Sequence, residues 1–257
     1  MPMTEPRIWA PRAGLLALGL ALLTPVFGTA NAELLVEGDF ETVKSGASLR
    51  RDIKGQDWYE SRRDTKAGRG LLILSTKPIA GNVTRKAMIK AHPDLNTYLS
   101  QPLATAQTGD FTVQYDICVK EILPDDNHSA FFFVGTNSDQ KRGPSSTAGE
   151  RFVFLGFENA SQAGKINLFA REGESPWEKK TIIAPGLALN RWYTISVAVY
   201  TAAGIYEVEV KGVKPWTEVK AFQTGGKSPK KLTHVSFASW NDGAGTFYVD
   251  NVTAWED

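Results

Sequence analysis

Carboxylate side chains stand close to both ends of the region that follows residue 32. Near its start the sequence reads V-E-G-D-F-E at residues 36–41, and near its end it reads T-F-Y-V-D-N-V at residues 246–252. Strands at the two ends of a β-sandwich often pair as neighbours, which would bring Asp39, Glu41 and Asp250 together. Their carboxylate oxygens suit a hard cation. We therefore expect a metal site where the ends meet; the alternative is that these are solvated residues at turns and strand ends.

Aromatic residues in or beside predicted loops form a second set of candidates. Sugars present C–H faces that stack on tryptophan and tyrosine rings, while the polar tips of these side chains can hydrogen-bond hydroxyl groups. Trp240 is the first choice, because the amide of Asn241 and the carboxylate of Asp242 follow it and polar groups beside an aromatic surface orient a ligand. The remaining candidates for ligand binding are Trp58, Tyr59 and Trp177. Core packing is the competing interpretation for each tryptophan.

A third set of residues has the side chains that glycan chemistry requires. Residues 111–119 alternate between apolar and polar, so Asp116 points away from the core, and Glu158 and Arg171 on later strands are expected to share its sheet face. Such a polar cluster on a concave face could bind a sugar or cleave it. The competing interpretation is a solvated outer face, since antiparallel sheets usually expose one side to water. The sequence contains no G-x-S-x-G, H-x-x-x-H or phosphate-binding motif.

Strands must position all of these residues. Alternating or short apolar runs bounded by turn residues predict strands, and they lie at 71–75, 111–119, 130–134, 151–157, 165–171, 179–183, 192–200, 205–210, 233–239 and 246–255. Residues 84–99 contain Pro93 and predict at most a short helix. Many strands joined by turns rich in glycine and asparagine are typical of an all-β sandwich or jelly roll. The polar loop at 135–150 is long enough to cover a sheet face.

Residues 1–32 have the pattern of an export signal. Positively charged residues precede an apolar run at 13–23, and A-N-A ending at Ala32 is a small-x-small cleavage site. The apolar run is shorter than the about 20 residues that cross a bilayer, which disfavours an uncleaved membrane anchor. We expect cleavage after Ala32, a secreted or periplasmic location, and a single jelly-roll domain over residues 33–257 without membrane insertion.

The composition excludes some partners and leaves others open. With 29 lysines and arginines against 28 aspartates and glutamates, the formal net charge is +1. So balanced a charge gives no general attraction to nucleic acid or to an anionic membrane. The chain has one cysteine, Cys118, so it cannot form an internal disulfide, and we expect this thiol to be a small strand side chain. The oligomeric state stays open.

Part of the sequence resembles a known family. Residues 190–197 read N-R-W-Y-T-I-S-V, and the strand that returns from this segment ends E-V-K-G at 209–212. This hairpin is similar to the W-Y-x-I-x-V … Y-x-V-x-V-x-G hairpin of concanavalin A-like (laminin G-like) jelly rolls. The segments 36–41 and 247–252 resemble the terminal motifs of carbohydrate-binding modules. The resemblance implies a two-sheet antiparallel jelly-roll β-sandwich.

The resemblance also implies a polysaccharide or oligosaccharide ligand and a structural Ca²⁺, for which Asp39, Glu41 and Asp250 supply oxygen ligands. Our first hypothesis is therefore a secreted glycan-binding protein of the lectin or carbohydrate-binding-module type. The alternative is a glycoside hydrolase or polysaccharide lyase that uses the concave sheet face. The E-x-D-x-x-E run of jelly-roll glycosidases is absent from the sequence, which favours the binding protein. A cell-surface structural or adhesion protein is the third hypothesis.

Overall fold

The computed structural model describes residues 33–42, 58–60, 72–90, 97–123, 128–136, 151–173, 179–223, 229–239 and 245–257. They belong to one compact unit, residues 31–257. The strands of these residues are β1 Tyr59–Glu60, β2 Leu72–Ser75, β3 Lys86–Lys90, β4 Thr97–Gln107, β5 Asp110–Ile122, β6 His128–Gly135, β7 Arg151–Asn159, β8 Lys165–Glu172, β9 Lys179–Ala188, β10 Trp192–Tyr200, β11 Ile205–Val210, β12 Lys220–Ala221, β13 Leu232–Ser239 and β14 Gly245–Glu256. Among the described residues, none forms a helix long and apolar enough to cross a membrane. The predicted export signal lies outside them.

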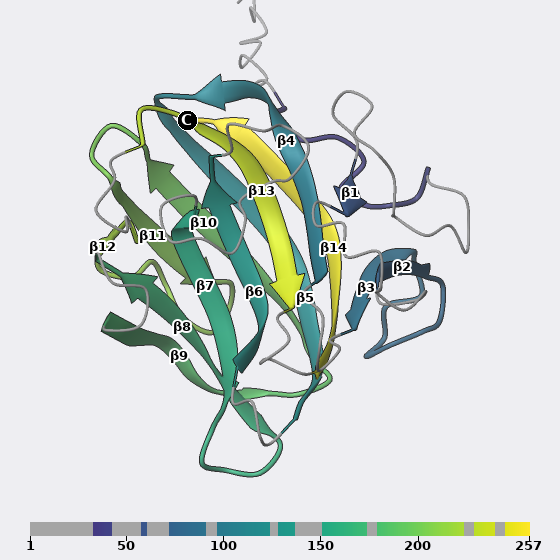
Figure 1. Cartoon of the computed structure of the whole chain (residues 1–257). Helices are drawn as coiled ribbons and strands as arrows, with labels where there is room; N and C mark the ends of the chain where they lie inside the picture. The colour runs from purple at the N-terminus through teal and green to yellow at the C-terminus, as the bar shows by residue number, and fades with distance from the viewer. Residues whose placement is uncertain are drawn as a thin grey trace, which may run out of the picture. The chain divides into compact units, whose positions relative to one another are not determined.

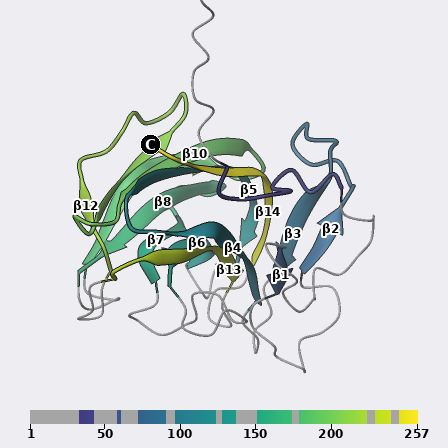
Figure 2. The same cartoon turned by 90° about the horizontal axis from the view of Figure 1, so that it is seen from above.

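The strands form two antiparallel sheets of seven strands each. Sheet A has the order β12-β11-β10-β5-β14-β3-β2, and sheet B has the order β1-β4-β13-β6-β7-β8-β9. Figure 2 shows the two sheets as separate layers, and Figure 1 shows sheet B from its outer side. The arrangement confirms the predicted two-sheet antiparallel jelly-roll β-sandwich.

The core lies between the sheets and follows from the period-two alternation of the strands. On β5 of sheet A, every second side chain from Phe111 to Val119 is buried. The ring of Tyr115 on this strand lies 4.5 Å from that of Phe132 on β6 and 5.1 Å from that of Phe237 on β13, measured between centroids. Aromatic side chains of opposite sheets therefore interdigitate, and this packing holds the two sheets together.

The segment at residues 33–42 runs alongside β14, so the two ends of the compact unit are neighbours, as the sequence predicts. The backbone N–H of Leu34 donates to the carbonyl of Ala254 at 2.7 Å, and that of Val252 donates to the carbonyl of Gly38 at 2.9 Å. A Cβ atom on Gly38 would lie 1.8 Å from the carbonyl oxygen of Val252. Glycine is required there because the two backbones approach too closely for any side chain.

Candidate functional site

The outer face of sheet B carries an apolar cluster that is separate from the core between the sheets. We call it the aromatic floor; its members are Tyr98, Phe131, Phe133, Phe154, Phe169 and Ala238. They come from the neighbouring strands β4, β13, β6, β7 and β8, and each is at most 2% exposed. Phe132, between two members, points the other way into the core. Sheet B is thus apolar on both faces, whereas an antiparallel sheet usually has one polar face.

The rings of the aromatic floor contact one another across the strands. The centroids of Phe133 and Phe154 are 4.9 Å apart in an edge-to-face arrangement, and those of Phe131 and Phe133 are 6.1 Å apart and stacked. Gly156 of β7 leaves room for two of the rings, because a Cβ atom there would lie 2.7 Å from Cζ of Phe169 and 2.8 Å from Cδ1 of Phe131. The glycine therefore lets aromatic side chains lie directly on the sheet backbone.

Two guanidinium groups lie over the aromatic floor. Cζ of Arg151 is 5.3 Å from the ring centroid of Phe133 and 5.2 Å from that of Phe154. Cζ of Arg171 is 5.5 Å from the ring centroid of Phe169. All three distances are within cation–π range. Burial lowers the pKa of the Arg171 guanidinium and the charge of Glu158 opposes this shift, so Glu158 favours the charged form.

A partly exposed polar rim borders the aromatic floor on the side of β9. Nζ of Lys180 lies 2.5 Å from Oε2 of Glu158, and Nε2 of His128 lies 3.5 Å from the same oxygen. The side chain of Lys180 is 36% exposed and that of His128 is 29% exposed. The ring of His128 also meets that of Phe169 edge to face at 5.4 Å. The rim therefore places a carboxylate, an ammonium group and an imidazole beside aromatic surface.

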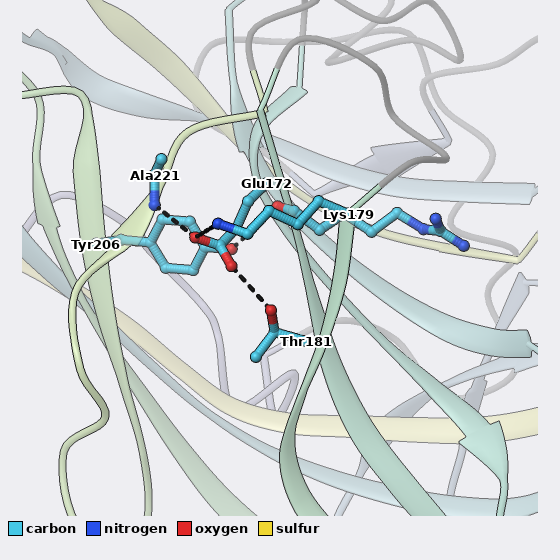
Figure 3. Close-up of polar contacts among 6 residues, drawn as sticks. Glu172, Lys179, Thr181, Tyr206 and Ala221 are labelled. Atoms are coloured by element: carbon cyan, nitrogen blue, oxygen red, sulfur yellow. Dashed lines mark hydrogen bonds and ion pairs between the residues drawn. The ribbon is translucent and has the colours of Figure 1, made fainter.

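The backbone next to Arg171 is fixed by contacts to sheet A, drawn in Figure 3. The hydroxyl of Tyr206 on β11 donates to the carbonyl of Arg171 at 3.3 Å. The carboxylate of Glu172, which is 5% exposed, accepts from the backbone N–H of Ala221 on β12 at 3.1 Å and from the hydroxyl of Thr181 on β9 at 3.0 Å. Lys179 lies 3.5 Å from this carboxylate. The end of β8 is thereby tied to both sheets, which restricts the position of Arg171.

The structure divides the three residues proposed for glycan chemistry between two sheets. Glu158 on β7 and Arg171 on β8 share the outer face of sheet B, as predicted, and the charge of Glu158 acts on the guanidinium of Arg171. Asp116 lies on β5 in sheet A, where its carboxylate accepts from Thr194 at 2.5 Å and from Asn251 at 2.8 Å. The prediction that Asp116 belongs to the same face is wrong, because alternation along a strand fixes the face but not the sheet.

Trp58 and Tyr59 are buried and do not offer a surface for a sugar. Trp58 is 3% exposed, its ring packs 5.6 Å from that of Phe40, and its Nε1 donates to the carbonyl of Val36 at 3.1 Å. Tyr59, on the short strand β1, is 1% exposed. These two residues are corrected from ligand-binding candidates to packed side chains. The candidates Trp240, Asn241, Asp242 and Trp177 lie outside the described residues and stay predictions.

The three carboxylates proposed for a calcium ion are held by donors of the protein. The carboxylate of Asp250 accepts from Nδ2 of Asn82 at 2.7 Å. Oε1 of Glu41 accepts from the backbone N–H of Arg85 at 2.7 Å, and Oδ1 of Asp39 accepts from the N–H of Glu41 itself at 3.2 Å. Within the described residues, no group of three or more histidine, cysteine, aspartate or glutamate side chains is placed to hold a metal. The donor set therefore does not fit Ca²⁺.

Two runs of consecutive apolar residues in the sequence indicate the aromatic floor, although the polar motifs do not. Residues 131–133 are consecutive phenylalanines, and residues 151–157 read R-F-V-F-L-G-F. Consecutive apolar residues on a strand place apolar side chains on both faces. Two such strands side by side indicate a sheet whose outer face is also packed, and they point to the arginines next to the phenylalanines.

Comparison with known proteins supports the fold. No family model and no curated protein matches this chain. A carbohydrate esterase from the Shiga toxin-encoding bacteriophage phi24B has a similar structure, with a TM-score of 0.51 and 11% identity over 83% of this chain and 100% of the esterase. A sialidase gives a TM-score of 0.50 and 11% identity over 82% of this chain, which spans only 18% of the sialidase. These similarities agree with the jelly-roll β-sandwich fold.

Proposed function

We propose that the protein is a recognition module that binds a glycan on the outer face of sheet B. The observation that carries this proposal is the partly exposed polar rim of Lys180, His128 and Glu158, which borders the aromatic floor. The ammonium group, the imidazole and the carboxylate of this rim can hydrogen-bond the hydroxyl and acidic groups of a sugar. A ligand contacts the rim at Lys180 and His128, and the buried phenylalanines hold the strands that carry these side chains.

The charges of this face favour a sugar that carries carboxylate or sulfate groups. Arg151, Arg171 and Lys180 are basic, and Glu158 is the acidic residue that contacts Lys180. Lys180 is the partly exposed cation of the rim, and a charged donor of this kind hydrogen-bonds a carboxylate or sulfate group. Calcium is not part of the proposal, since the residues expected to bind it do not fit the ion.

A binding experiment with one lysine from each outer face tests the proposal. The full protein is screened against acidic and neutral glycans, and dissociation constants are then measured by calorimetry for the glycans that bind. Lys180→Met should weaken binding about tenfold or more, because a hydrogen bond to a charged group is worth about 1.5–3 kcal/mol. Lys211→Met is the matched control, since Lys211 lies at the outer face of sheet A beside Gln114. Equal effects of the two variants, or binding of no glycan, contradict the proposal.

The contact between Glu158 and His128 favours one second candidate, an enzyme that cleaves the glycan on this face. A carboxylate and an imidazole 3.5 Å apart can transfer protons to and from a substrate. Glycans that bind are incubated with the protein and assayed for new reducing ends and for unsaturated sugars. Glu158→Gln should abolish such products, while Asp116→Asn on the other sheet should leave them unchanged. Binding without products from any glycan supports the recognition module.

A further inference from the structure

Lys86 on β3 is a fully buried lysine, with a side-chain exposure of 0%. Lysine is among the residues that are almost never fully buried unless a partner compensates the charge. Lys90 on the same strand is exposed. The environment of residue 86 in particular, and not that of the whole strand, therefore buries Lys86. A buried ammonium group needs oxygen atoms and negative charge around it.

The surroundings of Lys86 supply both. Its Nζ donates to the carbonyl oxygen of Thr84. Burial lowers the pKa of this ammonium group, and the carboxylates of Asp250 and Glu41 oppose that shift. The hydroxyl of Thr84 lies 3.0 Å from Oδ2 of Asp250, and Nδ2 of Asn82 lies 2.7 Å from the same oxygen. Hydrogen bonds through Thr84 therefore connect the ammonium group with the carboxylate of Asp250, and the carboxylate of Glu41, from the other end of the compact unit, acts on it through its charge.

We infer that the ammonium group of Lys86 supplies the positive charge at the junction of the two chain ends, in the place that the sequence pattern assigns to Ca²⁺. Glu41 belongs to the segment beside β14, and Asp250 belongs to β14 itself. These are two of the three carboxylates expected to bind the ion. A cation that is part of the chain neutralises them, so the junction needs no divalent ion from solution.

The arrangement of donors agrees with this role. The carboxylate of Asp250 accepts hydrogen bonds at both oxygens, from Asn82 at Oδ2 and from the backbone N–H of Asn251 at Oδ1 at 2.9 Å. Arg85, next to Lys86, contributes a second cation, since its guanidinium donates to the carbonyl of Glu41 at 2.7 Å. A divalent ion placed here would face two positive side chains and would have to displace protein donors.

Thermal unfolding of the full protein tests this inference without any glycan. The Tm of the unmodified protein should be the same in EDTA and in millimolar Ca²⁺. Lys86→Met, which keeps the length of the side chain, should lower the Tm by about 10 °C, because it leaves the buried carboxylate of Asp250 without its cation. Lys90→Met on the exposed position of β3 is the matched control and should change the Tm little.

A double-mutant cycle separates the charge of Lys86 from its packing. Asp250→Asn removes one carboxylate and keeps its shape. If Lys86 neutralises Asp250, the combined variant should lose clearly less in Tm than the sum of the two single variants. Additive losses overturn the inference, and so does a Tm of the unmodified protein that rises with Ca²⁺. If Lys86→Met fails to fold, the cycle is run with Lys86→Gln, and the EDTA measurement decides independently.

Discussion

The outer faces of the two sheets differ sharply, although each belongs to a seven-stranded antiparallel sheet. Around Asp116, the outer face of sheet A consists of polar side chains that bond to one another and are partly exposed. The outer face of sheet B consists of buried phenylalanines with guanidinium groups over them. Polar groups that bond to one another need no ligand, so a face rich in polar side chains is not by itself evidence of a binding site.

The two faces also differ in what their side chains contribute to folding. Removing a polar side chain from a wet face exchanges protein hydrogen bonds for hydrogen bonds to water, which changes the free energy of unfolding little. Removing a buried ring loses both transfer free energy and packing contacts. The contrast can therefore be measured by comparing substitutions on the two faces.

Phe154→Ala should give the largest effect. The residue lies on the outer face of sheet B, yet it is 0% exposed and contacts Phe133 and both arginines. We expect the free energy of unfolding to fall by about 3–5 kcal/mol, as for a phenylalanine in a core. Urea unfolding of this variant beside Thr194→Ala, from the outer face of sheet A, checks the result. A cost for Phe154→Ala as small as that for Thr194→Ala would show that the aromatic floor is not packed.

Gly156→Ala should give the next largest effect. The added methyl group would lie 2.7 Å from Cζ of Phe169, so that ring or the backbone must move, and overpacking of this kind costs about 1–3 kcal/mol. Gly109→Ala is the control, since a Cβ atom there meets nothing within 4 Å. Urea unfolding should separate the two variants. We also expect Gly156→Ala to alter glycan affinity, because it shifts the ring of Phe169, which contacts His128 and Lys180 of the rim.

The sequence predicts the fold well and the site only in part, for physical reasons. Alternation on residues 111–119 predicts a strand with Asp116 on its outer face, and the structure has both. The predicted strands say nothing about which of two sheets each one joins, so Asp116 was grouped with Glu158 and Arg171. Pairing between strands depends on contacts far apart in the chain, and a single sequence does not display them.

The sequence also does not show which aromatic side chains are buried in the core. A tryptophan before a strand, such as Trp58, has the same local pattern whether its ring faces a sugar or Phe40. The short helix predicted within residues 84–99 does not form at residues 86–90, because these residues pair with β14 as strand β3. Tertiary pairing overrides weak local propensity in such segments.

Cys118, at a covered part of the outer face of sheet A, should make a smaller contribution, to the pH dependence of the free energy of unfolding. Trp192 and Tyr248 pair with it from the neighbouring strands, and burial raises the pKa of its thiol from 9.0 to about 11. The folded protein thus holds this proton more tightly than the unfolded chain, so stability is present below pH 9 and decreases as the pH rises towards 11. Between pH 8 and pH 11 the unmodified protein should lose about 2 kcal/mol more than Cys118→Ala. Equal losses in urea unfolding would show that the thiol is not shielded.

Asp116→Asn should give the smallest effect. Asparagine keeps the shape of the side chain, and its carbonyl oxygen can still accept a hydrogen bond from Thr194 or Asn251, which contact the carboxylate at 2.5 and 2.8 Å. The free energy of unfolding should therefore change by less than about 1 kcal/mol, and the affinity for any glycan should not change. Dissociation constants for the glycan, measured for Asp116→Asn and Lys180→Met side by side, test this expectation. Loss of glycan binding in Asp116→Asn with the fold intact would move the binding site to sheet A and reverse the assignment of the two faces, because a hydrogen-bonded polar surface would then be the one that recognises the sugar.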